Sequence, residues 1–517
     1  MPSNLWSLIE PSLRRYAEHN AWICRQRDGN REVKYRQIHD AALCTAHDLR
    51  AAGVEQGDTV GITAPNGPEW TVAALAAFRI GSPIAPIHIG NSEHEIQAQI
   101  AAVNPKVMLV HESELEHHSK IAIKLQSDRE KISVETTQNA ADDPSSVAAR
   151  IYSSGSTGNP KVVKLSHCYI ASNVLAAVNL ESFNAEDKFI SLLPFSHAMG
   201  ITGNVNLPYY VGATLVSPKV LAANEILATL QEEKVSVVIA VPRLFRNVML
   251  GMEKKFASGG KGLVLYRKLL KSMPKNMRRY LNAPVRSKLG GNIKIWVSGG
   301  SHLDGRISRY YHDLGLPLRQ GYGLTETSPL SCVQDNFDDA VESVGRPIEQ
   351  VEVKIVDPDE NGNGEVWIRG PNVMLGYEDE AQNKEALQDG WFKTGDIATL
   401  DAKGRVTLTG RSKRLIVTEA GKNVYPEELE TLLERDPMVK EAGVLEAEMK
   451  PVCILSMEGN DPASEARRVL KDFNRLVSKH NQITRFAIID ELPRTPLGKM
   501  ALQELPHLFQ QFEIKGT

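Results

Sequence analysis

Cysteine is scarce in this chain, and its residues are too scattered to build a covalent or metal framework. Only five cysteines occur among 517 residues, and none belongs to a Cys-x-x-Cys pair. An odd number at such spacings argues against a disulfide framework and against structural zinc. The sequence therefore predicts a protein of a reducing compartment.

Long apolar runs and an excess of one charge are also missing. No run of 18 apolar residues occurs, and no signal-type apolar segment lies near the N-terminus. We therefore expect no transmembrane helix, and a cytoplasmic location. The net charge is −3, so no basic field of the whole chain indicates a nucleic-acid partner. Nothing in the sequence predicts the oligomeric state.

The length of the chain exceeds what one hydrophobic core accommodates. We expect two or more domains, because single cores stop growing well below 517 residues. Hydrophobic residues make up 42% and charged residues 24% of the chain, which is ordinary for a globular protein. No internal repeat or long low-complexity tract interrupts it.

Hydrophobic patterns in the first part of the chain alternate between helix and strand. Helices are predicted over 34–53, 68–80 and 92–102, and strands near 58–64, 83–87 and 106–110, with further strands near 235–241, 293–297 and 351–356. Alternating elements of this kind favour parallel sheets whose faces are covered by helices. The predicted fold class is α/β.

The end of the chain has a different pattern. Helices are predicted over 426–435 and 462–479, with strands near 442–445 and 452–456. Pro426 in a first helical turn with two glutamates beside it is typical of a helix N-terminus. We place a domain boundary near Arg411, which gives domains of residues 1–410 and 411–517. The second domain is predicted to be small and α+β.

The segment Tyr152–Lys161 is the most informative in the chain. It holds two glycines, three serines and one threonine, followed by proline and lysine. Such loops turn tightly, surround phosphate oxygens with N–H groups and hydroxyls, and supply a cation. The spacing from Gly155 to Lys161 does not fit a Walker A loop. Because strand-type residues follow at once, we predict a phosphate-binding loop between structured elements rather than a surface linker.

Six further motifs follow this segment in order. They are Leu193–His197, Ser298–Gly300, Gly321–Thr327, Gly390–Asp396, Gly410–Arg414 and Pro493–Lys499. Each is weak alone, but in this order they resemble the adenylate-forming superfamily of acyl-CoA synthetases, nonribosomal peptide adenylation domains and firefly luciferase. The resemblance covers about residues 30–500.

This resemblance implies a fold and a reaction. The fold is a large N-terminal domain of helix-covered parallel and mixed sheets that binds ATP and the acid, followed by a small mobile α+β lid domain. The reaction joins a carboxylic acid to the α-phosphate of ATP with release of pyrophosphate, and a thiol then displaces AMP. The implied cofactors are ATP, Mg²⁺ and CoA, or the phosphopantetheine of an acyl carrier protein.

The family's roles carry over to matching residues of this sequence. Tyr322 would stack on adenine, Thr325 would donate to a phosphate, and Glu326 would hold Mg²⁺, which prefers oxygen ligands. The predicted nucleotide-binding set also includes Ser153, Ser154, Gly155, Ser156, Thr157, Gly158, Lys161, Gly300, Gly321, Gly323, Asp396 and Arg411. Asp396 and Arg411 would bind the ribose.

Two catalytic residues complete the implied set. Lys499 would place its ammonium on the carboxylate and α-phosphate oxygens, and His197 would lie beside the carboxylate pocket, although a buried structural histidine is the alternative. Lys413 stands at the family's hinge position. Rotation there would replace Lys499 by the loop at Gly421 and open a pantetheine channel.

The chain departs from the family's pattern at two places. Val162 stands where a glycine usually follows the lysine of the phosphate loop. The turn at Glu446–Pro451 is shorter than expected, which puts CoA binding in question because that domain presents much of the CoA-facing surface.

Several motifs look like those of long-chain fatty acyl-CoA synthetases, among them Leu289–Gly300 and Gly421–Glu428. We therefore favour a fatty acid as substrate and CoA as acceptor. The alternatives are an enzyme that loads an acyl or aryl group onto a carrier protein, and a non-catalytic nucleotide-binding scaffold.

A basic stretch over residues 254–288 fits no motif. Eleven Lys or Arg and a single acidic residue, Glu253, lie between Met252 and Leu289. Two interpretations remain open for it. One is a solvated pair of basic helices, and the other is a peripheral contact with anionic lipid head groups or with the phosphates of a thioester carrier.

Overall fold

The computed structural model describes most of the chain. The described residues are 4–111, 122–124 (backbone only), 143, 145–153, 161–258, 269, 272–273, 282–418, 422–459, 461–494 and 500–514. Two compact units are present. Of the described residues, those within Met1–Ser153, Pro160–Glu352 and Ile368–Phe392 form the first unit, and those within Val353–Trp367 and Lys393–Thr517 form the second. The sequence-based division at Arg411 stays a prediction.

A nine-stranded sheet runs through the first unit. Its order is β15 (Arg346–Pro347), β14 (Cys332–Val333), β13 (Leu318–Tyr322), β12 (Ile295–Ser298), β11 (Val237–Ala240), β9 (Lys188–Ile190), β10 (Thr214–Ser217), β1 (Asn20–Cys24) and β2 (Arg31–Lys34). The six strands from β13 to β1 are parallel neighbours, and both edges are antiparallel. The two strands predicted near 235–241 and 293–297 are β11 and β12.

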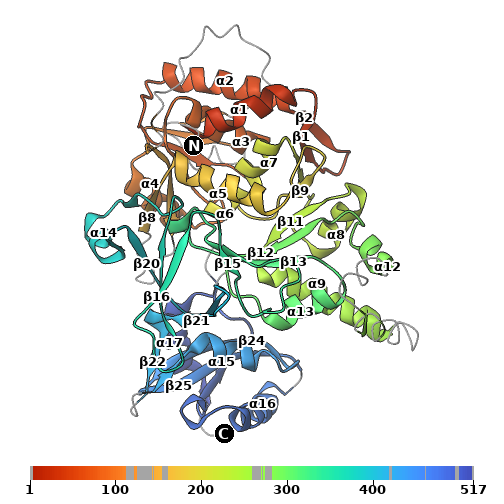
Figure 1. Ribbon diagram of the computed structural model, residues 1–517, viewed down its shortest axis with the longest axis vertical. Helices are drawn as coiled ribbons and strands as arrows, with labels where there is room; N and C mark the ends of the chain where they lie inside the picture. The colour runs from red at the N-terminus through yellow and green to blue at the C-terminus, as the bar shows by residue number, and fades with distance from the viewer. Residues whose placement is uncertain are drawn as a thin grey trace. The chain divides into compact units, whose positions relative to one another are not determined.

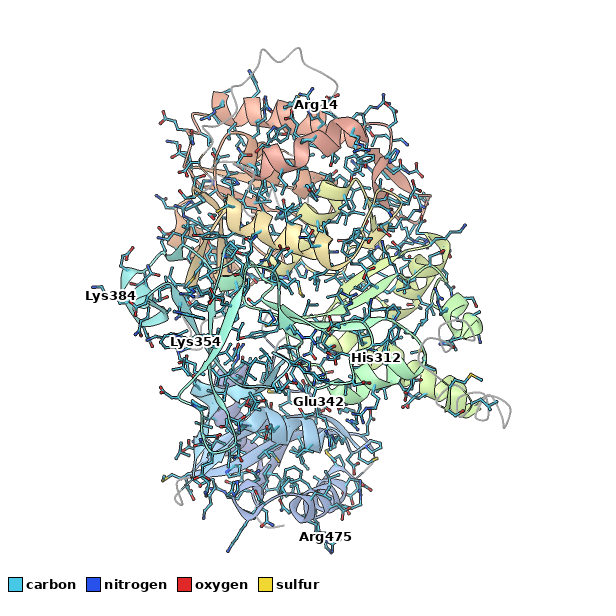
Figure 2. The ribbon with its side chains drawn as sticks, in the orientation of Figure 1. Arg14, His312, Glu342, Lys354, Lys384 and Arg475 are labelled. Carbon is cyan, nitrogen blue, oxygen red and sulfur yellow. The ribbon has the colours of Figure 1, made fainter. Side chains whose placement is uncertain are left out.

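Helices cover this sheet near β11–β13. They are α8 (Ala223–Glu232), α9 (Pro242–Ser258), α12 (Ala283–Lys288) and α13 (Gly305–Asp313), and Figure 1 shows α9 and α13 beside β12 and β13. Phe245 of α9, Trp296 of β12 and Tyr311 of α13 form a fully buried aromatic cluster. His312, labelled in Figure 2, lies with Nε2 2.8 Å from the Leu318 carbonyl. This contact ties α13 to β13, the strand that ends at Tyr322.

The first unit contains a second sheet of seven strands. Its order is β18 (Gly376–Tyr377), β8 (Lys161–Ser166), β7 (Val147–Ser153), β4 (Ile84–Pro86), β3 (Val60–Thr63), β5 (Val107–Val110) and β6 (Ala122–Lys124). The strands β4, β3, β5 and β6 are parallel, whereas β8 is antiparallel to both of its neighbours, β7 and β18. The mixed sheet confirms the predicted α/β class.

Other helices of the first unit surround these sheets. They are α1 (Leu5–Arg15), α2 (Tyr35–Ala51), α3 (Pro68–Arg79), α4 (Glu93–Val103), α5 (His167–Leu180), α6 (Ala198–Gly200), the π-helix η2 (Ile201–Asn206), α7 (Leu207–Val211), the 3-10 turn η3 (Thr325–Thr327) and α14 (Glu380–Ala386). Every residue of α3 except Glu69 is buried, because its many alanines let it pack on α2 on one side and on β3 on the other.

The helix boundaries follow capping chemistry. Pro68 opens α3, and Ser92 accepts from the Glu95 N–H while the Glu95 side chain accepts from Ser92 N–H at 2.7 Å. Such caps satisfy donors that a helix leaves unpaired. The helices predicted over 34–53, 68–80 and 92–102 are α2, α3 and α4, each within two residues of its predicted ends.

Two smaller sheets stand between the large sheets and the C-terminal part in the chain order. One has the order β16 (Glu352–Val356), β17 (Gly364–Arg369), β20 (Trp391–Leu400) and β19 (Leu387–Gln388), with β21 (Val406–Arg411) paired to β20. The other pairs β22 (Ile416–Val417) with β23 (Asn423–Val424). The 3-10 turn η4 (Ser412–Arg414) lies between β21 and β22.

The C-terminal part of the second unit is a four-stranded sheet with helices on both faces. The sheet is β24 (Val439–Ala447), β25 (Lys450–Met457), β26 (Phe486–Ile488) and β27 (Glu513–Ile514), and the helices are α15 (Pro426–Leu433), α16 (Pro462–Leu476), α17 (Leu505–Phe512) and the 3-10 turns η5 (Lys479–Asn481) and η6 (Leu502–Glu504). Cys453 and Leu455 pack with α15 and α16, whereas Val452 and Ile454 pack with α17. This alternation is what a strand buried on both faces requires.

A tight turn joins β24 to β25. Glu448 and Met449 both have positive φ, 55° and 56°, and Ala447 pairs with Lys450, which is the geometry of a two-residue hairpin turn. The short turn predicted at Glu446–Pro451 is therefore present. The small α+β architecture predicted for the end of the chain is also confirmed.

Candidate active site

The segment Gly321–Thr327 begins at the end of a buried strand. Tyr322 is the last residue of β13 and is 7% exposed. At Gly323 the chain passes so close to Pro329 that a Cβ would lie 1.9 Å from the Pro329 carbonyl oxygen. Only glycine fits there. The next turn, η3, carries Thr325 and Glu326 and begins three residues after the end of β13.

Glu326 is a buried carboxylate with an uncharged partner. Its residue is 8% exposed, and the hydroxyl of Tyr377 donates to Glu326 Oε1 at 2.9 Å. Its backbone carbonyl accepts from Met374 N–H at 2.8 Å. Burial and the Glu326 carboxylate raise the pKa of Tyr377, so the phenol stays protonated and remains a donor.

The two ends of the phosphate-loop motif are paired. Ser153 ends β7 and Lys161 begins β8, and these residues are partners in the antiparallel ladder. Lys161 Nζ lies 4.8 Å from the centre of the Tyr377 ring, a cation–π distance. Tyr377 therefore contacts Lys161 through its ring and Glu326 through its hydroxyl. Ser154, Gly155, Ser156, Thr157 and Gly158 lie outside the described residues.

His197 stands at the start of α6, next to a second histidine. Ser196 Oγ lies 3.3 Å from His88 Nδ1, and the rings of His88 and His197 are 6.0 Å apart between centroids. Burial lowers the pKa of His88, which favours the neutral ring. The segment is held by Asn66, which accepts from Phe195 N–H and donates to the Leu193 carbonyl.

The double glycine after β12 faces a methionine of α6. Gly300 has φ +84°, and a Cβ there would lie 3.5 Å from Met199 Cε. A Cβ at Gly299 would lie 2.9 Å from Met199 Sδ and 3.7 Å from the carbonyl oxygen of Gly321. The predicted residue Gly300 therefore lies next to the helix that follows His197, and the predicted residue Gly321 lies next to Gly299.

Asp396 and Arg411 face each other in the second unit. They are partners in the ladder of β20 and β21, and Arg411 Nε lies 3.0 Å from Asp396 Oδ1. Asp396 is buried, whereas the Arg411 side chain is 58% exposed. The Thr394 hydroxyl accepts from Asp396 N–H and donates to the Val366 carbonyl, which fixes the backbone at Asp396.

The remaining predicted residues lie near or beyond the limits of the description. Lys413 is in η4. Its neighbour Arg414 is locked by Glu427 at 2.9 Å and Glu430 at 2.6 Å. Lys499 and Gly421 lie outside the described residues, and so does most of the basic stretch 254–288. Their roles stay predictions.

The donor set fits a magnesium ion that is held mainly by phosphate oxygens. Within the described ranges, no group of three or more His, Cys, Asp and Glu side chains comes together as a metal site. Mg²⁺ typically binds to one or two carboxylates together with substrate phosphates. A single buried carboxylate at Glu326 therefore matches a Mg²⁺–nucleotide complex better than a metal held by protein alone.

A comparison with known protein families agrees with this geometry. The profile of the AMP-binding enzyme family matches residues 9–378, which include His197, Gly300, Glu326 and Tyr377. The chain belongs to the AMP-binding enzyme family. The resemblance and the prediction of an enzyme are thus confirmed.

Relatives within the AMP-binding family act on several acids. The long-chain-fatty-acid–CoA ligase FadD15 of Mycobacterium bovis is 29% identical, with 79% of this chain and 74% of that protein covered. The indoleacetate–CoA ligase of Aromatoleum aromaticum is 25% identical, with 92% of this chain and 93% of that protein covered.

A solved structure of a CoA synthetase has the same fold. The o-succinylbenzoate CoA synthetase of Bacillus subtilis, in complex with its acyl-adenylate, matches with a TM-score of 0.80 at 24% identity, over 100% of this chain and 99% of that one. At this identity the match shows the fold alone. The predicted adenylate-forming fold is confirmed.

Two residues of this AMP-binding enzyme were missed by sequence reasoning. Tyr377 follows Gly376 in a two-residue strand, and His88 follows a three-residue strand, so neither has a periodic pattern around it. Their partners Glu326 and Ser196 are 51 and 108 residues away. A Gly-Tyr pair next to an acidic Glu378 was the one local signal.

No helix in the described part of the chain has both the length and the apolar character needed to cross a bilayer. The predicted peripheral contact through residues 254–288 stays a prediction.

Proposed function

We propose that this AMP-binding enzyme is an ATP-dependent ligase of a fatty acid and a thiol. It joins the carboxylate to the α-phosphate of ATP, releases pyrophosphate, and transfers the acyl group to CoA. One observation carries the proposal: the buried Glu326 carboxylate has a neutral donor at 2.9 Å. The phenol adds no positive charge beside this carboxylate, which suits a cation that accompanies a triphosphate.

The barrier to this reaction is the repulsion between a carboxylate and a polyanion. Charge neutralisation and positioning lower such a barrier more than a nucleophilic side chain does. Mg²⁺ supplies positive charge to the triphosphate when it is bound. In the proposal Glu326 holds it, Thr325 donates to a phosphate, and Lys161 adds a second cation at the phosphates.

The nucleotide and the acid have separate partners in the proposal. Tyr322 stacks on adenine, Asp396 accepts from the ribose hydroxyls, and Arg411 reaches the same ribose. His197 lies beside the carboxylate, and Lys499 neutralises the charge that develops between acid and α-phosphate. Gly300 leaves room for the ligand where a side chain would fill it.

The acid is proposed to be apolar and aliphatic. The long-chain-fatty-acid–CoA ligase FadD15 is among the relatives, and the apolar side chains of Met199 and Val241 lie next to Gly300. A methionine adapts its shape to an apolar chain. Relatives that act on indoleacetate and on 2-succinylbenzoate make an aryl acid the first competitor.

Acid-dependent exchange between ATP and pyrophosphate tests the proposal. The purified chain is assayed with Mg²⁺ and a panel of acids from acetate to palmitate, with benzoates and indoleacetate included. We expect the fastest exchange with fatty acids of medium or long chain. A fastest rate with an aryl acid reassigns the substrate, and no exchange with any acid favours a non-catalytic nucleotide-binding scaffold.

A carrier protein is the second candidate acceptor. The tight turn at Glu448–Met449 leaves little chain there to contact the nucleotide end of CoA, and the phosphopantetheine of a carrier protein lacks that nucleotide. Single-turnover transfer from preformed acyl-adenylate to CoA and to a holo carrier protein separates the two. Fast transfer to CoA removes the carrier-protein candidate.

A further inference from the structure

Tyr377 joins two of the predicted phosphate-site residues within the first unit. It lies on β18, which pairs with β8 so that Tyr377 faces Val163 and Gly376 faces Lys164. This register brings the tyrosine ring to the start of β8, where Lys161 Nζ lies 4.8 Å from the ring centre. The residue itself is 4% exposed.

The hydroxyl of Tyr377 occupies one oxygen of Glu326. It donates to Oε1 at 2.9 Å, and the structure records no partner for Oε2 among the described residues. A neutral donor orients a carboxylate without cancelling its charge, whereas an arginine or a lysine would cancel it. One oxygen of Glu326 is therefore fixed by the protein, and the other is left for a cation.

The backbone of Tyr377 is clamped by a single side chain. Asn383 of α14 accepts from Tyr377 N–H at 2.6 Å and donates to the Tyr377 carbonyl at 3.1 Å. The preceding Gly376 has φ +140°, and a Cβ there would lie 2.7 Å from Asn383 Oδ1. Glycine, asparagine and tyrosine thus form one unit that points the hydroxyl at Glu326.

We propose that Tyr377 is a positioning residue for the metal–triphosphate site. Its hydroxyl orients Glu326 toward Mg²⁺, and its ring holds the ammonium of Lys161 beside the same phosphates. The inference rests on the proposed function, because it assumes that Glu326 and Lys161 bind a metal nucleotide. Partners that orient a metal ligand commonly change metal affinity 10–100-fold when they are removed.

The test is Tyr377→Phe, which removes the hydroxyl and keeps the ring. We expect the Mg²⁺ concentration for half-maximal ATP–pyrophosphate exchange to rise about tenfold, with a small change in the KM for the acid. Binding of Mn²⁺ in the presence of a non-hydrolysable ATP analogue, followed by electron paramagnetic resonance, should weaken by the same factor. An unchanged Mn²⁺ affinity overturns the proposal.

A matched control separates positioning from stability. Tyr35→Phe removes another buried hydroxyl of the first unit, one that donates to the Ala213 carbonyl at 2.6 Å. It should lower the melting temperature and leave the Mg²⁺ and Mn²⁺ curves unchanged. If Tyr35→Phe shifts the metal curves as far as Tyr377→Phe does, the effect is general loosening and the proposal fails.

Two more variants cover the clamp and the ring. Asn383→Ala should reproduce part of the Mg²⁺ effect with the hydroxyl still present, because the tyrosine is no longer held. Tyr377→Leu should add a loss of affinity for the ATP analogue through Lys161. Mn²⁺ binding reports on Tyr377 even if the wild-type chain activates no acid in the panel, so failure of the proposed function and failure of this inference are distinguishable.

Discussion

Glu326 in the first unit and Asp396 in the second are both buried carboxylates, but their partners differ in charge. Glu326 accepts from the neutral hydroxyl of Tyr377 at 2.9 Å. Asp396 faces the guanidinium of Arg411 at 3.0 Å. Each is less than a tenth exposed, so burial does not separate them. The partner does.

The difference teaches what each carboxylate is suited to bind. A carboxylate beside a guanidinium has its charge compensated and is left with spare lone pairs, which suits the neutral hydroxyls of a sugar. A carboxylate beside a phenol keeps its charge uncompensated, which suits a hard cation. In the proposed function, metal and phosphates are accordingly assigned to Glu326, and ribose to Asp396.

Glu326→Gln should have the largest effect of the variants that test the contrast between Glu326 and Asp396. A neutral amide is a poor ligand for a hard cation, so we expect acid-dependent pyrophosphate exchange to fall on the order of 100-fold or more. The remaining rate should need much more Mg²⁺. Exchange measured against Mg²⁺ concentration checks this.

The control for Glu326→Gln is Glu342→Gln. Glu342, labelled in Figure 2, is an exposed glutamate that accepts from Gly305 N–H at 3.2 Å. It should leave the Mg²⁺ curve in place. A Glu326→Gln enzyme with an unchanged Mg²⁺ dependence would place the metal at another residue.

The two carboxylates can be compared only at a pH at which the first unit is folded. We expect His167 to set the lower limit of that pH range. This histidine is buried at the start of α5, and its Nδ1 accepts from Leu5 N–H at 3.2 Å. Burial lowers its pKa from 6.5 to about 4. Since the unfolded chain gains the proton first, stability is complete above pH 6.5 and falls by about 3 kcal/mol as pH drops to about 4.

Urea unfolding at pH 7 and at pH 4.5 measures this loss. His167→Asn keeps an acceptor for Leu5 N–H but does not titrate, so its stability should depend less on pH than that of the wild type by most of that amount. Equal pH dependence in the two proteins would mean that His167 is not the group responsible.

Arg411→Ala should have the smallest effect of these variants, and it tests the part of the contrast that concerns Asp396. Without its guanidinium, Asp396 regains an uncompensated charge and the ribose loses a donor, so the KM for ATP should rise about tenfold. The Mg²⁺ dependence should not change. Arg405→Ala is the matched control, because Arg405 pairs with Asp401 at 2.7 Å in the same hairpin. If Arg411→Ala raised the Mg²⁺ requirement as much as Glu326→Gln does, the proposed assignment of metal to Glu326 and ribose to Asp396 would be wrong.

Elements with a strong local pattern could be predicted from the sequence. The helices α2, α3 and α15 and the strands β5 and β12 have periodic apolar positions or capping residues, which act over a few residues. The helix predicted over 462–479 ends at Leu476 instead. Val477 has extended backbone, and the 3-10 turn η5 begins two residues later.

The candidate site was predictable only where chemistry and motif coincide in the chain. Glu326 and Asp396 stand in recognisable segments, whereas Tyr377 and His88 take their meaning from strand pairing and from side chains far along the chain. The π-helix after α6 also has no local signal, since its register depends on buried contacts such as Thr202 to the Ser328 carbonyl. Tertiary contacts of this kind cannot be read from spacing.

The pairing of β18 with β8 sets an order of events during synthesis of the chain. Glu326 leaves the ribosome 51 residues before Tyr377, a delay of roughly 3 to 10 s at usual rates of translation. During this interval the carboxylate has no phenol to meet it, and the edge of β8 has no partner from β18. The nascent enzyme therefore carries an open sheet edge and an unsupported acidic group until Gly376 and Tyr377 emerge.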